Sequence, residues 1–444
     1  MVRTISTLAI ITILCSMVQA DLLPPVVCGV PVQVPESLAT TPFDIPRTLC
    51  LPPGFSISVV ARIPGARFLA VTPDRGLLVS QPSTGRIIFV DPAADPSSNA
   101  SVYARGLYLP HDLVFHTIDE QTYLYVGRGD AIVRFRWNPG DRAAHDAEVV
   151  VRDLPSGSSG ELRGAYAHEL KNFAIDSEHR LYVAIASATN ANPEERNATP
   201  MRAAIHRYEA DGSNGRLFAA GLRNAEGVRF LPGSDQLWAV VNNRDNLAYP
   251  FEDGSGLFRQ VFQEYVNNHP PEAFTAVRDG GDYGWPFAHP NADTDAGWEN
   301  MPFAADAENN PLGAMYPVEK FDRISKGIPA HSAPLGLTFL QHTNFVPAFA
   351  NGAVVALHGS WNRVPATGYK VVYFPWNTET QQPGPQQDLV SGWLDEVSGD
   401  VWGRPVATAV DSSGNLLISD DHSGTIYRVT YSEPVAPTAS GSNP

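Results

Sequence analysis

The chain has few cysteines, few methionines and a shortage of positive charge. Its 444 residues include only three cysteines and five methionines, and 31 lysines and arginines stand against 47 aspartates and glutamates, which leaves a net charge of −16. So acidic a chain lacks the basic face that nucleic acid or an anionic membrane requires, and we expect neither as a partner. The few cysteines form neither a CxxCH haem-attachment motif nor a zinc-type cluster.

Long apolar runs are also scarce, and the one present lies at the N-terminus. Residues 1–20 begin with a basic segment that ends in Arg3, continue through LAIITILCSMV and end in Val18-Gln19-Ala20, a small-x-small motif. This pattern predicts a signal peptide cleaved after Ala20, because the run is shorter than the roughly 20 residues that cross a bilayer. We therefore expect a secreted, extracellular protein, or a periplasmic one if the host is bacterial.

Cleavage there would leave two cysteines in an oxidising compartment. Cys28 and Cys50 both lie in the segment 21–50, and we expect them to form one disulfide that fixes this N-terminal arm. Asn99 and Asn197 stand in sequons, which predicts glycosylation sites in a eukaryotic host. The Pro/Ser-rich residues 432–444 are expected to form a disordered tail.

Sustained helical periodicity is absent, and an alternating pattern recurs in its place. Six segments each contain short runs of apolar and polar residues at period two, separated by turn residues. Hairpin units repeated in this way predict an all-β, six-bladed β-propeller over residues 51–431, whose functional residues lie in loops around a central channel. The six segments are residues 69–90, 112–135, 172–208, 227–241, 336–374 and 407–431.

A long insertion, residues 246–335, separates the fourth segment from the fifth. It is rich in proline, glycine and aromatic residues. Loops of this length in compact domains are often lids or specificity elements, so we expect an ordered loop that shapes substrate choice.

Several polar groups stand directly before or after the repeats. His168 precedes the third repeat and could act as a general base at the channel mouth, or serve as a hydrogen-bonded structural histidine. Arg223 and Asn224 precede the fourth repeat and suit a flat anionic or carbonyl-bearing ligand, with a solvated loop as the alternative. The amides and carboxylate of residues 242–246 are oxygen donors of the kind calcium accepts, although a polar turn is the commoner outcome.

Two further segments, 357–363 and 402–406, combine glycine and tryptophan with an imidazole or a cation. They suggest a planar ligand or a sugar, and a tryptophan buried between blades is equally ordinary. Because imidazole, arginines and oxygen donors come from different repeats, we expect them to converge on one central site.

Six motifs between residues 221 and 421 carry a resemblance to a known family, and the resemblance covers the chain from about residue 50 to residue 431. They resemble the soluble quinoprotein glucose/sorbosone dehydrogenase family, especially its sorbosone dehydrogenase-like and fungal pyranose dehydrogenase branch. The motifs are GLRNAEG at 221–227, DGGDYGWPF at 279–287, PAHSAPLGL at 329–337, LHGSWNR at 357–363, GYKVV at 368–372 and WGRPVATAVDSSGNLLISDD at 402–421.

The resemblance implies a propeller that binds pyrroloquinoline quinone (PQQ) and Ca²⁺ in its central channel. His168 would take the proton of a sugar hydroxyl, and Arg223 would stabilise negative charge on a quinone oxygen. Arg223 and Asn224 would contact the quinone, and Arg404 its carboxylates. The implied activity is hydride transfer to PQQ from a hydroxyl or hemiacetal of an aldose, ketose or sorbosone-like sugar, with a cytochrome or small mediator as external electron acceptor.

The same resemblance extends to the metal and to two further channel residues. It places the metal at Asn243, Arg244 and Asp245, where Asn243 replaces the acidic residue or glycine of many relatives. Arg67 resembles a channel arginine of the pyranose branch, and His358 lies near a cofactor-binding lysine of the glucose dehydrogenases. Both are therefore expected to bind the cofactor, together with His168.

Two other functions fit the same architecture. One is a calcium-dependent lactonase, which would need no arginines for a polyanionic cofactor. The other is a propeller without catalysis that binds a glycan or a protein through the same loops. Calcium binding without quinone binding would favour the second.

Overall fold

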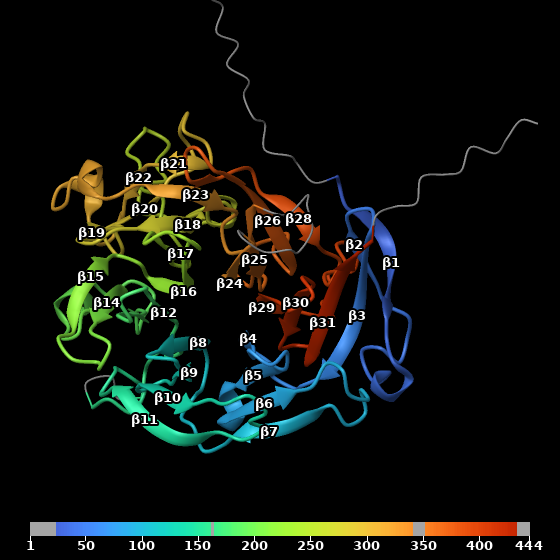
Figure 1. The fold of residues 1–444 in the computed structure, drawn as a ribbon. Coiled ribbons are helices and arrows are strands. Elements are labelled where there is room, and N and C mark those ends of the chain that lie inside the picture. The colour runs from blue at the N-terminus through green and yellow to red at the C-terminus, as the bar shows by residue number, and fades with distance from the viewer. Residues whose placement is uncertain (1–23, 161–163, 341–350, 433–444) are drawn as a thin grey trace, which may run out of the picture.

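A computed structural model describes residues 24–160, 164–340 and 351–432. The predicted signal peptide, 1–20, and all but the first residue of the predicted tail, 432–444, lie outside the described residues. Six small sheets stand in a ring around a central axis, which confirms the predicted all-β, six-bladed propeller (Figure 1). Within the described part of the chain, the helices are too short and too polar to span a membrane.

The first two blades are simple four-stranded antiparallel sheets, and the third resembles them with one added strand. Blade one contains β4 (Leu69–Val71), β5 (Leu77–Gln81), β6 (Arg86–Val90) and β7 (Ala100–Ala104). Blade two contains β8 (Leu113–Ile118), β9 (Gln121–Gly127), β10 (Ile132–Arg136) and β11 (His145–Val151). Blade three contains β12 (Phe173–Ile175), β13 (Leu181–Ile185), β14 (Ala204–Tyr208), β15 (Arg216–Ala220) and the added β19 (Gly281–Asp282).

Blade four draws three of its strands from the insertion, which differs from the expectation of an ordered loop over 246–335. Its strands are β16 (Asn224–Phe230), β17 (Leu237–Asn242), β18 (Glu272–Val277), β23 (Ile324–Ile328) and β21 (Glu299–Met301). The insertion also forms the short helix α1 (Gln263–Val266) and a ribbon of β20 (Ala288–Pro290) and β22 (Phe303–Ala305). The insertion therefore supplies strands that complete blade four, and it also forms a separate helix and ribbon.

Blades five and six complete the ring. Blade five contains β24 (Pro334–Phe339), β25 (Gly352–Leu357), β26 (Lys370–Asn377), β27 (Gln382–Pro383) and β28 (Gln387–Val390). Blade six contains β29 (Pro405–Val410), β30 (Leu416–Asp420), β31 (Thr425–Tyr431), β3 (Phe55–Arg62), β1 (Val27–Gln33) and β2 (Thr48–Leu51). The 3₁₀ turns are η1 (Glu36–Leu38), η2 (Pro82–Thr84), η3 (Pro193–Asn197), η4 (Pro311–Gly313) and η5 (Val318–Lys320).

The two ends of the propeller sequence meet in blade six. β3, near the start of the chain, pairs antiparallel with β31, near its end, and the two lie side by side in Figure 1. The N-terminal arm continues this sheet, because β1 pairs with β3, and the predicted disulfide Cys28–Cys50 is present and joins β1 to β2. Cys50 also bridges to Ser391 of the blade-five segment, so the arm ties two blades together.

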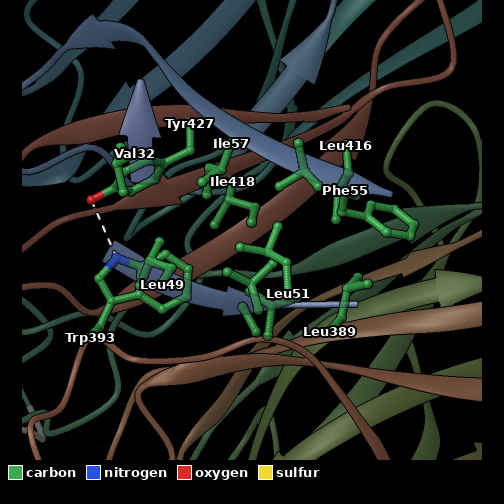
Figure 2. Packing of buried hydrophobic residues seen from close by; sticks show 14 of the residues in the cluster. Val32, Leu49, Leu51, Phe55, Ile57, Leu389, Trp393, Leu416, Ile418 and Tyr427 are labelled. Atoms are coloured by element: carbon green, nitrogen blue, oxygen red, sulfur yellow. Dashed lines mark hydrogen bonds between the residues drawn. The ribbon is translucent and has the colours of Figure 1, made fainter. Parts of the chain in front are cut away.

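A large core cluster lies where blades five and six meet this arm. Leu49, Leu51 and Ile57 pack against Leu416 and Ile418, all of them buried (Figure 2). The Trp393 indole N–H donates a hydrogen bond of 3.3 Å to the Tyr427 hydroxyl in the same cluster. Strands covered by neighbouring blades are apolar on both faces, as in β25, where all six residues are buried.

The six inner strands β4, β8, β12, β16, β24 and β29 all run in the same direction along the axis. This follows because the first four strands of each blade pair antiparallel and the fourth strand leads into the next inner strand. Gly336 of β24 faces β29 so closely that a Cβ there would lie 2.6 Å from Ala407 Cα. We call the end of the channel where the inner strands begin the mouth; residues just before each inner strand therefore gather there.

Candidate active site

Polar residues precede the inner strands at the mouth, one set from each blade. Below them, side chains of all six inner strands enclose a cavity of about 440 Å³ that leads away from the mouth. The residues at the strand starts are Arg67 before β4, His111 and Asp112 before β8, Asn172 before β12, Arg223 and Asn224 at β16, His331 before β24 and Arg404 before β29. The topology therefore brings groups from distant parts of the sequence to one place, as predicted.

His168 is held in the tautomer that a general base requires. Its Nδ1 lies 2.8 Å from the carbonyl oxygen of Ser187, and because a carbonyl only accepts, Nδ1 carries the proton. Nε2 then presents a lone pair, and it has no hydrogen-bond partner among the described residues. Burial, followed by the positive charge of Arg223, lowers the pKa of His168 to about 4. The imidazole is therefore neutral and able to accept a proton at ordinary pH.

This low pKa gives a testable pH dependence in the cofactor-free protein. The unfolded chain protonates a histidine near its ordinary pKa of about 6.5, whereas folded His168 stays neutral until about pH 4. Between those values the unfolded state binds more protons, so this histidine lowers the free energy of unfolding as the pH falls. We expect the stability of His168→Gln to fall less than that of the unaltered protein between pH 7 and pH 4, as measured by urea unfolding. Equal pH slopes for the two proteins would contradict the assignment, and the NMR titration of this ring supplies its pKa directly.

Arg223 is nearly enclosed and fixed by oxygen acceptors. Its Nε and one terminal nitrogen donate to the carbonyl and the side-chain oxygen of Asn190 at 3.1 and 3.0 Å. The other terminal nitrogen donates to the Asn243 carbonyl at 2.7 Å, and the nitrogen that donates to the Asn190 side chain also lies 3.3 Å from the Asp245 carboxylate. These four contacts fix the plane and the orientation of the guanidinium.

In the predicted metal loop, 243–245, the side chains of Asp245 and Arg244 lie in different surroundings. The Asp245 carboxylate lies between Arg223 and His331, whose Nδ1 is 3.7 Å away. The Arg244 side chain instead pairs with Asp306 and Glu308, at 2.6 and 2.5 Å. A guanidinium has no lone pair, so Arg244 could reach a metal only through its backbone carbonyl.

A second buried carboxyl group lies beneath the same loop. Glu272 of β18 accepts a hydrogen bond of 2.6 Å from the backbone N–H of Asn243. Burial raises its pKa to about 7, so this carboxyl can hold a proton near neutral pH. Within the described residues, no group of three or more histidine, cysteine, aspartate or glutamate side chains has the arrangement of a metal site. The loop by itself therefore offers fewer than the six to eight oxygens that calcium takes.

The opposite wall of the mouth is formed by Arg67, His358 and Arg404. Asp421 bridges the first two, because its carboxylate accepts from Arg67 at 2.9 Å and lies 2.9 Å from His358 Nε2. Arg404 donates to the carbonyl oxygens of His358 and Gly359, each at 3.0 Å. Arg67, Arg404 and His358 are thus brought together as predicted, and Asp421 is a partner that the sequence reasoning missed.

A buried polar layer closes the channel below the mouth. One oxygen of Glu226 lies 3.2 Å from His111 Nε2 and accepts from the Asn172 amide at 2.6 Å. Burial alone would raise the pKa of Glu226, but His111 and the charge of Arg67 outweigh it and lower that pKa. Beside this layer Arg229 forms a two-pronged ion pair with the buried Asp112, both contacts at 2.8 Å. Sequence reasoning did not single out Glu226, His111 or Asp112.

One donor at the mouth is buried without a partner, and it tests which ligand would fit. Within the described residues, Arg67 Nε has no hydrogen-bond acceptor. Buried polar groups in folded proteins are ordinarily satisfied, so this donor calls for an acceptor from outside the chain. Together with Asn224, Arg223 and Arg404, it fits a flat ligand that bears several anionic oxygens.

The fold and the site thus define a six-bladed propeller whose mouth combines a neutral imidazole with several arginines. The profile of the TrAA12-like family matches residues 49–432. The chain belongs to the TrAA12-like family, which confirms the resemblance that its motifs indicated.

Two curated relatives match part of the chain. A PQQ-dependent sugar dehydrogenase of Hypocrea jecorina is 26% identical over 277 residues, which cover 56% of this chain and 59% of the relative. An uncharacterised protein of Borreliella burgdorferi is 26% identical over 281 residues, 63% of either chain. The chain thus spans about three-fifths of the length of these relatives.

Among solved structures, the holo form of the pyranose dehydrogenase PQQ domain from Coprinopsis cinerea superposes with a TM-score of 0.69 at 20% identity. That alignment covers 86% of this chain and 97% of the domain. At this level of identity the likeness supports the fold.

Proposed function

We propose that this chain is a PQQ-dependent sugar dehydrogenase, which oxidises a sugar hydroxyl or hemiacetal to a ketone or lactone. The observation that carries the proposal is the neutral His168, whose free Nε2 shares the mouth with the anion-binding Arg223, Arg67 and Arg404. A relative in the same family is named a PQQ-dependent sugar dehydrogenase. A proton acceptor beside a site for a polyanionic oxidant is the combination that alcohol oxidation needs.

The positions of four residues around the mouth, and the unpartnered Nε of Arg67, support the proposed cofactor contacts. Arg223 and Asn224 would contact the quinone from the blade-four side, and Arg67 and Arg404 would contact its anionic groups from the opposite wall. When bound, the quinone supplies the two-electron oxidant. Because Arg223 is held by four oxygen acceptors, it keeps its orientation while negative charge develops near it.

The chain's own part in the reaction is proton transfer and positioning. The substrate hydroxyl gives its proton to His168 Nε2 as the carbon–hydrogen bond breaks, and the carbonyl product keeps the oxygen. The Ser187 carbonyl, which accepts from Nδ1–H at 2.8 Å, stabilises the imidazolium that results. Glu226 adds to this effect, since its negative charge raises the pKa of His168 against the effect of burial.

Calcium enters the proposal through the 243–245 loop. The Asp245 carboxylate and the backbone carbonyls offer some oxygens, but Arg223 already occupies the Asn243 carbonyl and one side of Asp245. The remaining ligands would have to come from water and the cofactor. Calcium affinity should therefore depend on the quinone.

We also propose that the protein works outside the cytosol, with a sugar substrate and a separate electron acceptor. The Cys28–Cys50 disulfide supports an oxidising compartment.

Titration of the metal-stripped protein with PQQ, with and without calcium, tests this function directly. We expect tight quinone binding that requires calcium, and dye reduction driven by some members of a panel of aldoses and ketoses. Without quinone, calcium should bind more weakly than about 10⁻³ M, because the loop lacks a full ligand set. Absence of quinone binding at any calcium level would refute the proposal. Lactone hydrolysis by the calcium-loaded, quinone-free protein would support the lactonase in its place.

A further inference from the structure

A tryptophan projects into solvent beside the mouth. Trp361 is 73% exposed, and Val364 of the same loop is 67% exposed. This loop, residues 358–369, joins β25 to β26 on the mouth side of blade five, and we call it the Trp361 loop. Large apolar side chains left exposed on a soluble protein mark contact sites, so Trp361 calls for a partner.

The inner part of the Trp361 loop is rigid. Gly359 adopts φ +107°, and a Cβ there would lie 2.4 Å from the Tyr369 ring, so only glycine fits. The backbone N–H of Ser360 donates to the Thr367 carbonyl at 2.9 Å, and the Tyr369 hydroxyl donates to the Ser360 carbonyl at 2.6 Å. Trp361 is therefore presented on a fixed backbone, which limits the entropy lost on contact.

The outer part of the loop is anchored to the insertion. The side-chain oxygen of Asn267 accepts from the Val364 N–H at 2.9 Å, and its amide donates to the Val364 carbonyl at 2.6 Å. Arg363 donates to the Asn267 carbonyl at 2.7 Å. Thus both halves of the loop are fixed, and Trp361 lies between them.

These anchors hold the Trp361 loop at the mouth end of blade five, whereas His168 precedes the inner strand of blade three. At its root the loop supplies the two carbonyls that hold Arg404, in His358 and Gly359. At its far end it contacts Asn267, next to Val266, whose carbonyl accepts from His331. His331 faces Asp245, which pairs with Arg223 of blade four. A ring at His168 and a ring at Trp361 would therefore contact different blades.

A pyranose ring suits an exposed tryptophan on a fixed loop. Its apolar face of C–H groups can pack on the aromatic ring while its hydroxyls stay in water.

We infer that Trp361 is a stacking platform for a sugar ring remote from the one that reacts, so that the substrate class is oligosaccharides. The inference rests on the proposed sugar dehydrogenase function. The reacting ring would lie at His168, and a neighbouring ring of the same chain would lie on Trp361. A monosaccharide would occupy the His168 end alone.

Calorimetry on the cofactor-free protein tests the platform without any redox chemistry. The probes are the methyl glycosides of a β-1,4-linked glucose trisaccharide and of glucose, and the variants are Trp361→Ala and Trp361→Phe. We expect Trp361→Ala to weaken trisaccharide binding about tenfold, and Trp361→Phe to retain most of it. Turnover by the PQQ-loaded enzyme is measured with the free trisaccharide and free glucose in place of their methyl glycosides. Trp361→Ala should raise KM for the trisaccharide by a similar factor, while kcat and KM for glucose stay unchanged.

Trp298→Ala is the matched control, because Trp298 is 45% exposed in the insertion and takes no part in the Trp361 loop. It should leave trisaccharide binding unchanged. The inference is overturned if the unaltered protein binds the two glycosides equally, or if Trp361→Ala binds the trisaccharide normally. Normal binding with slower reduction of a protein acceptor would assign Trp361 to acceptor docking instead. If the trisaccharide binds through Trp361 but no sugar reduces a dye, the proposed redox function fails and the platform stands.

Discussion

His168→Gln is expected to lower kcat of the PQQ-loaded enzyme by about 10²- to 10⁴-fold, the range that a positioned general base contributes. Glutamine can fill much of the space of the imidazole but cannot accept the hydroxyl proton near neutral pH. The arginines at the mouth remain in place, so PQQ affinity should change little. Stopped-flow dye reduction gives kcat, and calorimetry gives the affinity for PQQ.

His116→Gln is the control for this change. His116 lies in β8 and contacts His179 at 2.7 Å, away from the mouth. We expect its kcat to equal that of the unaltered enzyme. If kcat of His168→Gln stayed within a factor of a few of the unaltered value, His168 would not be the base, and Glu272 would be the next residue to replace.

Arg223→Leu is expected to weaken PQQ binding roughly 100-fold. The reason is that a buried hydrogen bond between charged groups contributes about 1.5–3 kcal/mol to the binding free energy. The same change leaves the Asp245 carboxylate with only His331, at 3.7 Å. Breaking a buried ion pair in this way should also lower the free energy of unfolding by about 3 kcal/mol. Calorimetry and urea unfolding measure the two effects separately.

A second substitution separates these two consequences. Arg223→Leu combined with Asp245→Asn removes the unpaired charge and should recover most of the stability, yet PQQ affinity should remain low. Arg216→Leu is the surface control, since Arg216 pairs with Asp279 where both are partly exposed. Recovery of PQQ affinity in the double variant would show that Arg223 acts only through Asp245.

The blade pattern was readable from the sequence because each inner strand is followed by its hairpin partner. Three strands of blade four were not predicted. β18 and β23 are separated by residues 278–323, which include β21, so no short turn links them and no repeat is visible. Their strand conformation is decided by pairing across the sheet and by burial between blades, which local composition does not encode.

Sequence reasoning found site residues where a polar or charged side chain stands directly before a strand repeat, as with His168 and the Arg223–Asn224 pair. Glu226 lies in the same GLRNAEG motif, but nothing near it in the sequence marks its role. Its partners His111 and Asn172 are 115 and 54 residues away. Arg244 shows the reverse case, since only the fold reveals that its side chain is held by Asp306 and Glu308.

The pairing of β3 with β31 has a consequence for the order in which this molecule matures. β31 completes the sheet that contains β3, one of the first strands of the chain, so the ring cannot close until translation has passed Tyr431. The groups at the mouth come from blades on every side, and Arg67 and Asp421, which meet across this seam, are 354 residues apart. A nascent or truncated chain therefore has no complete mouth. Only a chain whose ring has closed should therefore bind an anionic ligand at the mouth, so binding of that ligand marks a fully synthesised propeller.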